Sequence, residues 1–121
     1  TEQGAAGGGG EREESAASIA VEYIASHYAQ PMTMEELARH LSVSQSSLYR
    51  QFVRRYGISP KRFLMEYRMD RACELLSEGN YSVQEVSNSV GFEDPFYFSR
   101  AFRESKGVSP KQYAAEHRRR R

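Results

Sequence analysis

Two arginines, Arg50 and Arg100, lie 50 residues apart at matching places in two similar stretches of the chain. Each lies among serine and tyrosine residues and precedes a phenylalanine by two positions. A guanidinium group carries a planar fork of donors, which can pair with O6 and N7 of guanine when an α-helix lies in a major groove. The two arginines are therefore candidate base-reading residues.

The two stretches, residues 33–63 and 82–113, are copies of one pattern. Each has a capped short helix, a tight turn, a second capped helix that ends in basic residues, and then Gly-x-Ser-Pro-Lys. Equivalent positions are 49 residues apart before the turn and 50 after it. The extra residue falls in the turn region, where an insertion is tolerated. Two helix-turn-helix copies in one small chain imply two readers of one extended partner, for which DNA is favoured.

Helical periodicity gives the second helix of each copy a buried side and an outward side. The positions expected on the buried side are Leu48, Phe52, Phe98 and Phe102. The outward positions are Ser46, Ser47, Arg50 and Arg54 in the first copy and Phe96, Tyr97, Arg100 and Arg103 in the second, with Tyr49 and Ser99 on the flanks. Both outward stripes are thus centred on an arginine.

Phe96 and Tyr97 are two adjacent aromatic residues on a side expected to face outward. They could contact thymine methyl groups or the sugar edge of DNA, or they could pack against a neighbouring helix. The two alternatives are balanced for Tyr97, and DNA contact is favoured for Phe96.

Phosphate contacts are expected from helix N-termini and from nearby basic side chains. The candidates are Ser44, Arg54, Arg55, Lys61, Arg62, Arg103 and Lys111. For any one of them a solvated position without a role is the simpler interpretation. Lys61 and Lys111 are the exception, because both follow a helix start in the same place of each copy.

Capping and breaking signals predict about seven helices and no strand, and hence an all-α fold. Capping boxes begin at Thr33 and Ser82, and Ser44, Ser59, Asp94 and Ser109 are further N-caps. The predicted helices cover residues 15–30, 34–41, 45–56, 60–77 and 83–90, then 95 to about 105 or 106, and a final short helix opens at Pro110 and carries Tyr113. Two helix-turn-helix subdomains, joined by one long linker helix, are the expected architecture.

The domain boundaries follow from these helices and from composition. Residues 1–14 are rich in glycine and then charged, which favours a flexible linker or tail. The first helix-turn-helix subdomain is expected at 15–58, the linker helix at 59–78, the second subdomain at 79–117 and a basic tail at 118–121. The linker helix, on the order of 27 Å long, could hold two reading helices near the ~34 Å separation of successive major-groove faces.

Charge is unevenly distributed along the 121 residues. The formal net charge is only +1, but residues 31–121 hold 16 basic and 11 acidic residues. This excess suits a polyanionic partner. The single cysteine, Cys73, rules out an intramolecular disulfide framework. The chain has no apolar run near the ~18 residues that a membrane span requires.

The residues described above resemble the signature of the AraC/XylS transcription regulators. The resemblance lies in Gly91-Phe92-x-Asp94-x-x-Tyr97-Phe98-Ser99-Arg100-x-Phe102, in Gly107-x-Ser109-Pro110-x-x-Tyr113, and in Arg68-x-x-x-Ala72-x-x-Leu75-Leu76. It covers about residues 17–114. By this resemblance, the base-reading residues are Gln45, Ser46, Tyr49 and Arg50 in the first copy and Phe96, Tyr97, Ser99 and Arg100 in the second.

The resemblance also implies a biological setting. Members are bacterial, and a cytoplasmic, nucleoid-associated regulator that activates transcription through contact with RNA polymerase is implied here. The chain could be the DNA-binding portion of a larger regulator or a regulator in its own right, and the isolated domain is expected to be monomeric. Ser87 and Ala114 depart from the alanine and arginine that the family often has, and the second departure lies where the resemblance implies a phosphate contact.

Two other classes of function compete with this interpretation. Some proteins join such a module to methyl transfer on a cysteine, but Cys73 lies within a patterned helix and is expected to be a packing residue. Because the three histidines have no metal-ligand spacing, neither a metal nor a cofactor is expected. A protein-interaction module without DNA binding is the second alternative, and the matched Arg50 and Arg100 argue against it.

Overall fold

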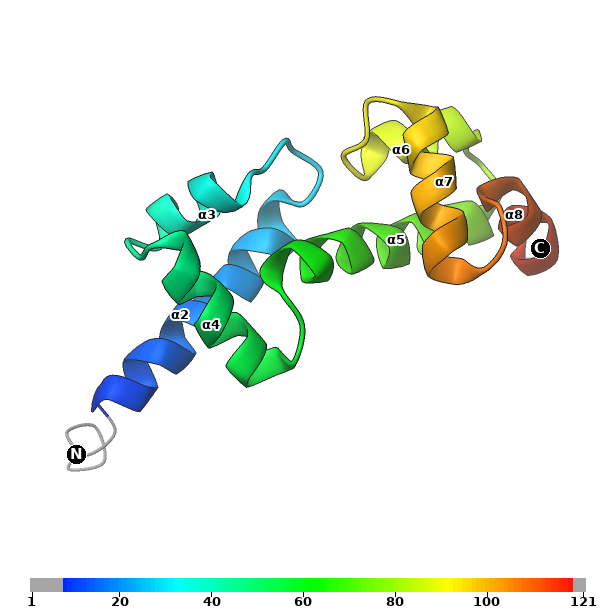
Figure 1. The fold of residues 1–121 in the computed structure, drawn as a ribbon. Coiled ribbons are helices and arrows are strands. Elements are labelled where there is room, and N and C mark those ends of the chain that lie inside the picture. The colour runs from blue at the N-terminus through cyan, green and yellow to red at the C-terminus, as the bar shows by residue number, and fades with distance from the viewer. Residues whose placement is uncertain (1–7, 119–121) are drawn as a thin grey trace. The chain divides into compact units, whose positions relative to one another are not determined.

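The computed structural model describes residues 8–118, with side chains from residue 16 onward, and these residues form seven helices and no strand (Figure 1). The helices are α2 (Gly8–His27), α3 (Met34–His40), α4 (Gln45–Tyr56), α5 (Pro60–Glu78), α6 (Val83–Ser89), α7 (Pro95–Lys106) and α8 (Pro110–His117). The predicted all-α class with two helix-turn-helix pairs, α3–α4 and α6–α7, is confirmed.

The described residues divide into two compact units, unit 1 (residues 8–27 and 32–64) and unit 2 (residues 28–31 and 65–118). The division differs from the sequence-based one in two places. The linker helix α5 is not a separate segment, because its first turn belongs to unit 1 and the rest to unit 2. The short connector between α2 and α3 belongs to unit 2 as well.

The core of unit 1 forms where α2 and α3 pack against α4 (Figure 1). Its buried side chains are Ala17, Ala20, Ile24, Leu37, Ala38, Leu48, Phe52 and Leu64. The ring of Phe52 lies 4.8 Å from that of Tyr56 and 5.5 Å from that of Phe63. The first turn of α5 therefore completes the core that holds α4 in place.

The core of unit 2 is built from α5, α6 and α7 and from the turn before α7. Its buried side chains are Met69, Ala72, Leu76, Val86, Val90, Phe92, Phe98 and Phe102. Tyr113 of α8 closes one side, with its ring edge-on to Phe102 at 5.6 Å. The hydroxyl of the buried Ser87 donates to the carbonyl O of Phe92 at 3.2 Å, so serine replaces the expected alanine without an unpaired hydroxyl.

A buried arginine, Arg68, binds the connector segment into unit 2. Its Nε donates to the carbonyl O of Tyr28 at 2.8 Å, and its Nη2 donates to the carbonyl O of Gln30 at 3.0 Å. The guanidinium also lies over the ring of Phe92, 5.6 Å from the centroid. Gly91 lies against the same groups with a φ of +100°. Arg68 thus holds the connector to the turn of the second helix-turn-helix.

The capping interactions predicted from sequence form in both copies. Thr33 Oγ1 accepts from the amide of Glu36 at 3.0 Å, and Glu36 Oε1 accepts from the amide of Thr33 at 3.2 Å. Ser82 and Glu85 make the same pair of bonds at 3.0 and 2.8 Å. Each box satisfies two amides that a helix N-terminus leaves unpaired.

The two chain ends differ from the sequence-based expectation. Helix α2 begins at Gly8 instead of Ser15, so residues 8–14 are helical and not a flexible tail. Glutamate and arginine at 11–14 favour helix, and acidic residues stabilise a helix N-terminus, which explains the extension. Residues 1–7 and 119–121, parts of the expected tails, lie outside the described residues.

Candidate nucleic-acid interface

Helix α4 presents a polar side opposite its buried one. The Oγ of Ser44 caps the helix by accepting from the amide of Ser47 at 3.0 Å. The exposed residues of this surface are Gln45, Ser46, Tyr49, Arg50 and Arg54. Ser47, expected to face outward, is half-buried, and its Oγ accepts from Nε2 of Gln51 at 2.8 Å. The outward stripe therefore runs through Ser46, Tyr49 and Arg50.

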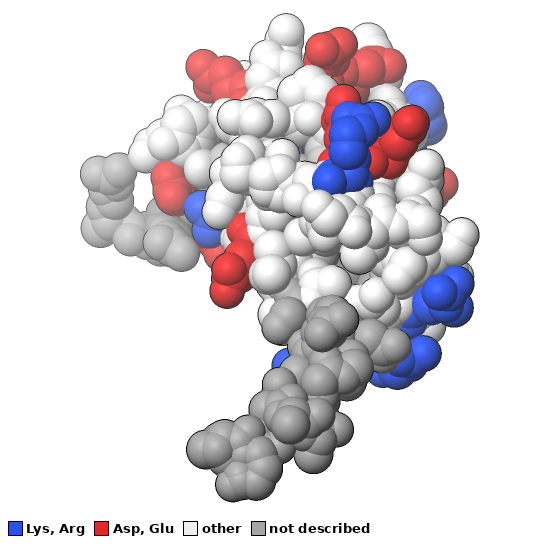
Figure 2. All heavy atoms as spheres, turned by 90° about the vertical axis from the view of Figure 1, so that its left-hand side faces the viewer, with Lys and Arg blue, Asp and Glu red and all other residues white. Residues whose placement is uncertain are grey.

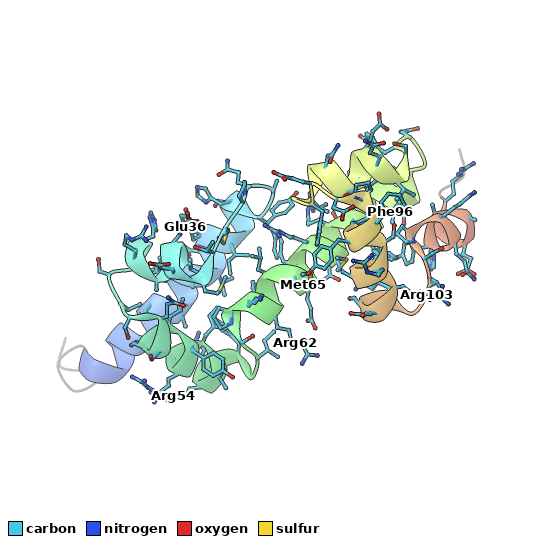
Figure 3. The ribbon with its side chains drawn as sticks, turned by 45° about the horizontal axis from the view of Figure 1, so that its top comes forward. Glu36, Arg54, Arg62, Met65, Phe96 and Arg103 are labelled. Carbon is cyan, nitrogen blue, oxygen red and sulfur yellow. The ribbon has the colours of Figure 1, made fainter. Side chains whose placement is uncertain are left out.

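Helix α7 has the same two-sided construction, with Phe98 and Phe102 buried as predicted. Asp94 caps the helix, accepting from the amide of Phe96 at 2.9 Å. Phe96 is 77% exposed in the first turn, and Arg103 is exposed in the last turn (Figure 3). Arg100 is exposed between them, and Ser99 is half-buried.

Tyr97 combines the two roles that the sequence left open. Its ring packs on the ring of the buried Phe92, with 5.6 Å between centroids. It is nevertheless 47% exposed, and the guanidinium of Arg100 lies over it at 5.9 Å from the centroid. Phe96, in contrast, makes no ring contact with the described residues. Phe96 is thus the more exposed of the two aromatic side chains on this side of α7.

The phosphate candidates lie at helix ends. Lys61 and Lys111 are exposed in the first turns of α5 and α8, which begin at equivalent Ser-Pro pairs. The Oγ of Ser59 accepts from the amide of Arg62 at 3.1 Å, and that of Ser109 accepts from Gln112 at 3.1 Å. Arg54 and Arg103 are exposed in the last turns of α4 and α7.

Several other charged groups are committed within the protein. Nζ of Lys106 donates to Oδ1 of Asp70 at 2.6 Å, and this bond raises the pKa of Lys106. Arg71 pairs with Glu74, and Arg39 with Glu35 at 3.6 Å. The face of the molecule in Figure 2 accordingly carries charges of both signs. The candidate interface is therefore defined by the exposed arginines of α4 and α7 more than by a uniform basic patch.

Catalysis on a cysteine, metal binding and membrane insertion would each require a particular feature in the structure. Cys73 is half-buried in unit 2, and burial raises the pKa of its thiol, which disfavours the nucleophilic thiolate. Within residues 8–118 no cluster of three potential metal ligands occurs. No helix in this part of the chain is long and apolar enough to cross a membrane.

Sequence reasoning missed two features of this region. The structural role of Arg68 depends on carbonyl groups about 40 positions earlier in the chain, and no local pattern indicates it. The contact between Tyr97 and Arg100 had a usable signal, because residues three apart on a helix are neighbours.

Comparison with known proteins shows the class of protein to which the chain belongs. Residues 37–116 match a family described as a helix-turn-helix domain. The C-terminal domain of AraT, a response regulator from Geobacillus stearothermophilus, superposes with a TM-score of 0.84 and 35% identity, covering 87% of this chain and 88% of that one. The DNA-binding domain of AdpA, solved in complex with a target DNA, gives 0.79 and 30%, covering 83% and 90%.

Curated relatives then give the family. The raffinose operon transcriptional regulatory protein RafR of Pediococcus pentosaceus is 38% identical over 96 residues, which are 79% of this chain and 35% of that protein. The lactose operon transcription activator of Staphylococcus xylosus is 33% identical over 94 residues, or 78% and 34%. The chain belongs to the AraC/XylS family of DNA-binding transcription regulators. It spans about a third of the length of these curated relatives.

Proposed function

We propose that this chain binds double-stranded DNA sequence-specifically by placing α4 and α7 in two adjacent major grooves. The observation that carries the proposal is the exposed arginine at the same place on both helices, each opposite a buried pair of apolar side chains. Such an arginine can pair bidentately with guanine. The AdpA domain, 30% identical, was solved in complex with a target DNA, which supports DNA as the partner here.

The proposed contacts divide into base edges and phosphates. The candidate base-reading residues are Gln45, Ser46, Tyr49, Arg50, Phe96, Tyr97, Ser99 and Arg100. The phosphate-binding residues are Ser44, Arg54, Lys61, Arg103 and Lys111. The backbone contacts would fix the register of each helix, and the base contacts would supply the sequence preference.

The names of two relatives support a role in transcription regulation. Two of them are named as regulators of sugar operons, one of these as an activator. We infer that this chain is the DNA-binding portion of a larger bacterial regulator, acting in the cytoplasm at the nucleoid, without catalysis and with RNA polymerase as its second partner. The isolated domain would bind as a monomer, because it carries both reading helices.

A selection from random duplexes tests the proposal, followed by binding measurements by fluorescence anisotropy at several salt concentrations. We expect two preferred blocks, with centres about ten base pairs apart. Arg50→Ala should relax the preference at one base pair of one block and Arg100→Ala at one base pair of the other, each at a loss of about 1–3 kcal/mol on the preferred site.

Three results would contradict the proposal. A chain that enriches no sequence does not read bases. Binding without salt dependence would point to a protein-interaction module, because phosphate neutralisation releases counterions. An equal loss on all duplexes in Arg100→Ala would place this arginine on phosphate instead of a base.

A further inference from the structure

Four side chains of unit 2 form a continuous row from the core to the surface of α7. The guanidinium of the buried Arg68 lies over the ring of Phe92 at 5.6 Å, and the ring of Phe92 lies 5.6 Å from that of Tyr97. The guanidinium of Arg100 lies over the ring of Tyr97 at 5.9 Å. The row begins at an arginine fixed by two backbone carbonyls and ends at an exposed arginine.

This row limits the freedom of Arg100 before any partner binds. An exposed arginine side chain samples many rotamers, and ordering it on binding carries an entropic cost. The face of an aromatic ring attracts a guanidinium, so a fixed ring restricts where that group lies. Tyr97 is such a ring, because it rests on Phe92, which is buried and held by the core.

Unit 1 has no equivalent of this row. The positions that correspond to Tyr97 and Phe92 are Ser47 and Val43. Ser47 is bonded to Gln51, and Arg50 has no ion pair or ring contact with other described residues. The two candidate base-reading arginines therefore lie at matching positions, but only Arg100 has an aromatic ring beside its guanidinium group.

Building on the proposed function, we propose a different role for one of its base-reading candidates: Tyr97 is a positioning residue for Arg100, and it acts on specificity through that arginine instead of through its own contact with a base. The guanidinium is held near its DNA-bound position, so a correct base pair gains more from it than an incorrect one. Helix α7 consequently discriminates more sharply at its arginine position than α4 does at Arg50.

A double-mutant cycle tests the proposal, using the wild type, Tyr97→Leu, Arg100→Ala and the double variant. The measured quantity is the ratio of dissociation constants for two duplexes, the selected one and one altered at the base pair whose preference Arg100→Ala removes. Tyr97→Leu should lower this ratio about two- to fivefold, the size of an exposed cation–π contact. In the Arg100→Ala background the same change should leave the ratio unchanged.

Two further variants at position 97 distinguish the effect of the aromatic ring's electrostatic character from the effects of the hydroxyl and of the ring's shape. Tyr97→Phe keeps the ring and should keep the ratio. Pentafluorophenylalanine at position 97 keeps the ring but reverses its electrostatic character, and should lower the ratio without unfolding the domain. Tyr81→Leu is the matched control, since Tyr81 is a tyrosine of unit 2 that is 45% exposed but lies outside α7.

The outcomes are distinct. A loss of ratio in Tyr97→Phe, or an equal loss with and without Arg100, would show that Tyr97 contacts a base itself and would overturn the proposal. If Tyr97→Leu loses the same affinity for both duplexes and has a lower melting temperature, Tyr97 only stabilises the fold, and this result would also overturn the proposal. If the wild type shows no base preference at all, the proposed function fails, which is a different result from a wild type that discriminates independently of Tyr97.

Discussion

The arginines of this chain differ in what surrounds the guanidinium group. Arg68 is buried and donates to two backbone carbonyls, and Arg71 pairs with a carboxylate. Arg50 and Arg100 are exposed, and among the described residues no carboxylate pairs with either. A count of basic residues therefore overstates the charge that can meet a phosphate or a base. The environment of each arginine decides its role.

Replacing Arg68 by lysine should destabilise unit 2 by about 1–3 kcal/mol. Lysine keeps the charge but cannot reach both carbonyls with the planar fork of arginine, so at least one buried acceptor loses its partner. Urea denaturation, followed by circular dichroism, measures the change in the free energy of unfolding.

The matched control is Arg39→Lys, since Arg39 is an exposed arginine that is paired with the exposed Glu35 at 3.6 Å. An exposed ion pair contributes little, so this change should alter stability by less than about 0.5 kcal/mol. Equal effects of the two substitutions would show that the carbonyl contacts of Arg68 carry no special weight.

At the scale of the element, α7 separates stability from recognition on its two sides. Phe102→Ala should lower the free energy of unfolding by about 3–5 kcal/mol, because it leaves a cavity beside Phe98 and Tyr113. Phe96→Ala, on the exposed side of the same helix, should change it by less than about 0.5 kcal/mol. Thermal melting of both variants tests the assignment, and a large loss in Phe96→Ala would reverse it.

Two glycines with a positive φ, Gly91 in the turn before α7 and Gly57 at the C-terminus of α4, differ in how much room surrounds them. A Cβ on Gly91 would lie 2.8 Å from the carbonyl O of Tyr28, and the φ of Gly91 is +100°. A Cβ on Gly57, at a φ of +81°, would meet nothing within 4 Å. Gly57→Ala should therefore cost only the left-handed conformation, about 1–2 kcal/mol.

Gly91→Ala should cost more than Gly57→Ala, because the backbone of the connector must also move. Chemical denaturation of the two variants gives both values on one scale. A smaller loss for Gly91→Ala would mean that the Tyr28–Pro31 segment yields easily and is not fixed by Arg68.

The elements themselves were predictable because their signals are local. Thr33 with Glu36 marks a helix start, and Gly57 marks a helix end with its left-handed φ. Burial of Phe52 and Phe102 follows from helical spacing alone. The site was less predictable: Ser47 lies on the outward stripe by spacing yet is half-buried against Gln51. The roles of Arg68 and Tyr97 depend on neighbours that only the tertiary fold supplies.

At the scale of the whole molecule, each unit carries one candidate reading helix, followed by a helix that begins with Ser-Pro-Lys. The two copies are more alike in sequence at these helix starts than at the reading surfaces. On the reading surfaces, Tyr49 and Arg50 of α4 correspond to Ser99 and Arg100 of α7. This contrast is expected if the helix starts bind phosphate, which every sequence presents, and the reading surfaces bind different bases.

The same contrast predicts how binding depends on salt. Each phosphate contact contributes about 0.9 to the slope of the logarithm of the binding constant against that of salt concentration. Lys61→Ala and Lys111→Ala should each reduce the slope by about that amount and leave the base preference unchanged, since a lysine acts on phosphate as a point charge. Arg39→Ala is the control, because Arg39 is paired with Glu35 on α3. An unchanged slope in the Lys61 and Lys111 double variant would remove these two lysines from the interface, whereas an equal reduction in Arg39→Ala would attribute the effect to net charge alone.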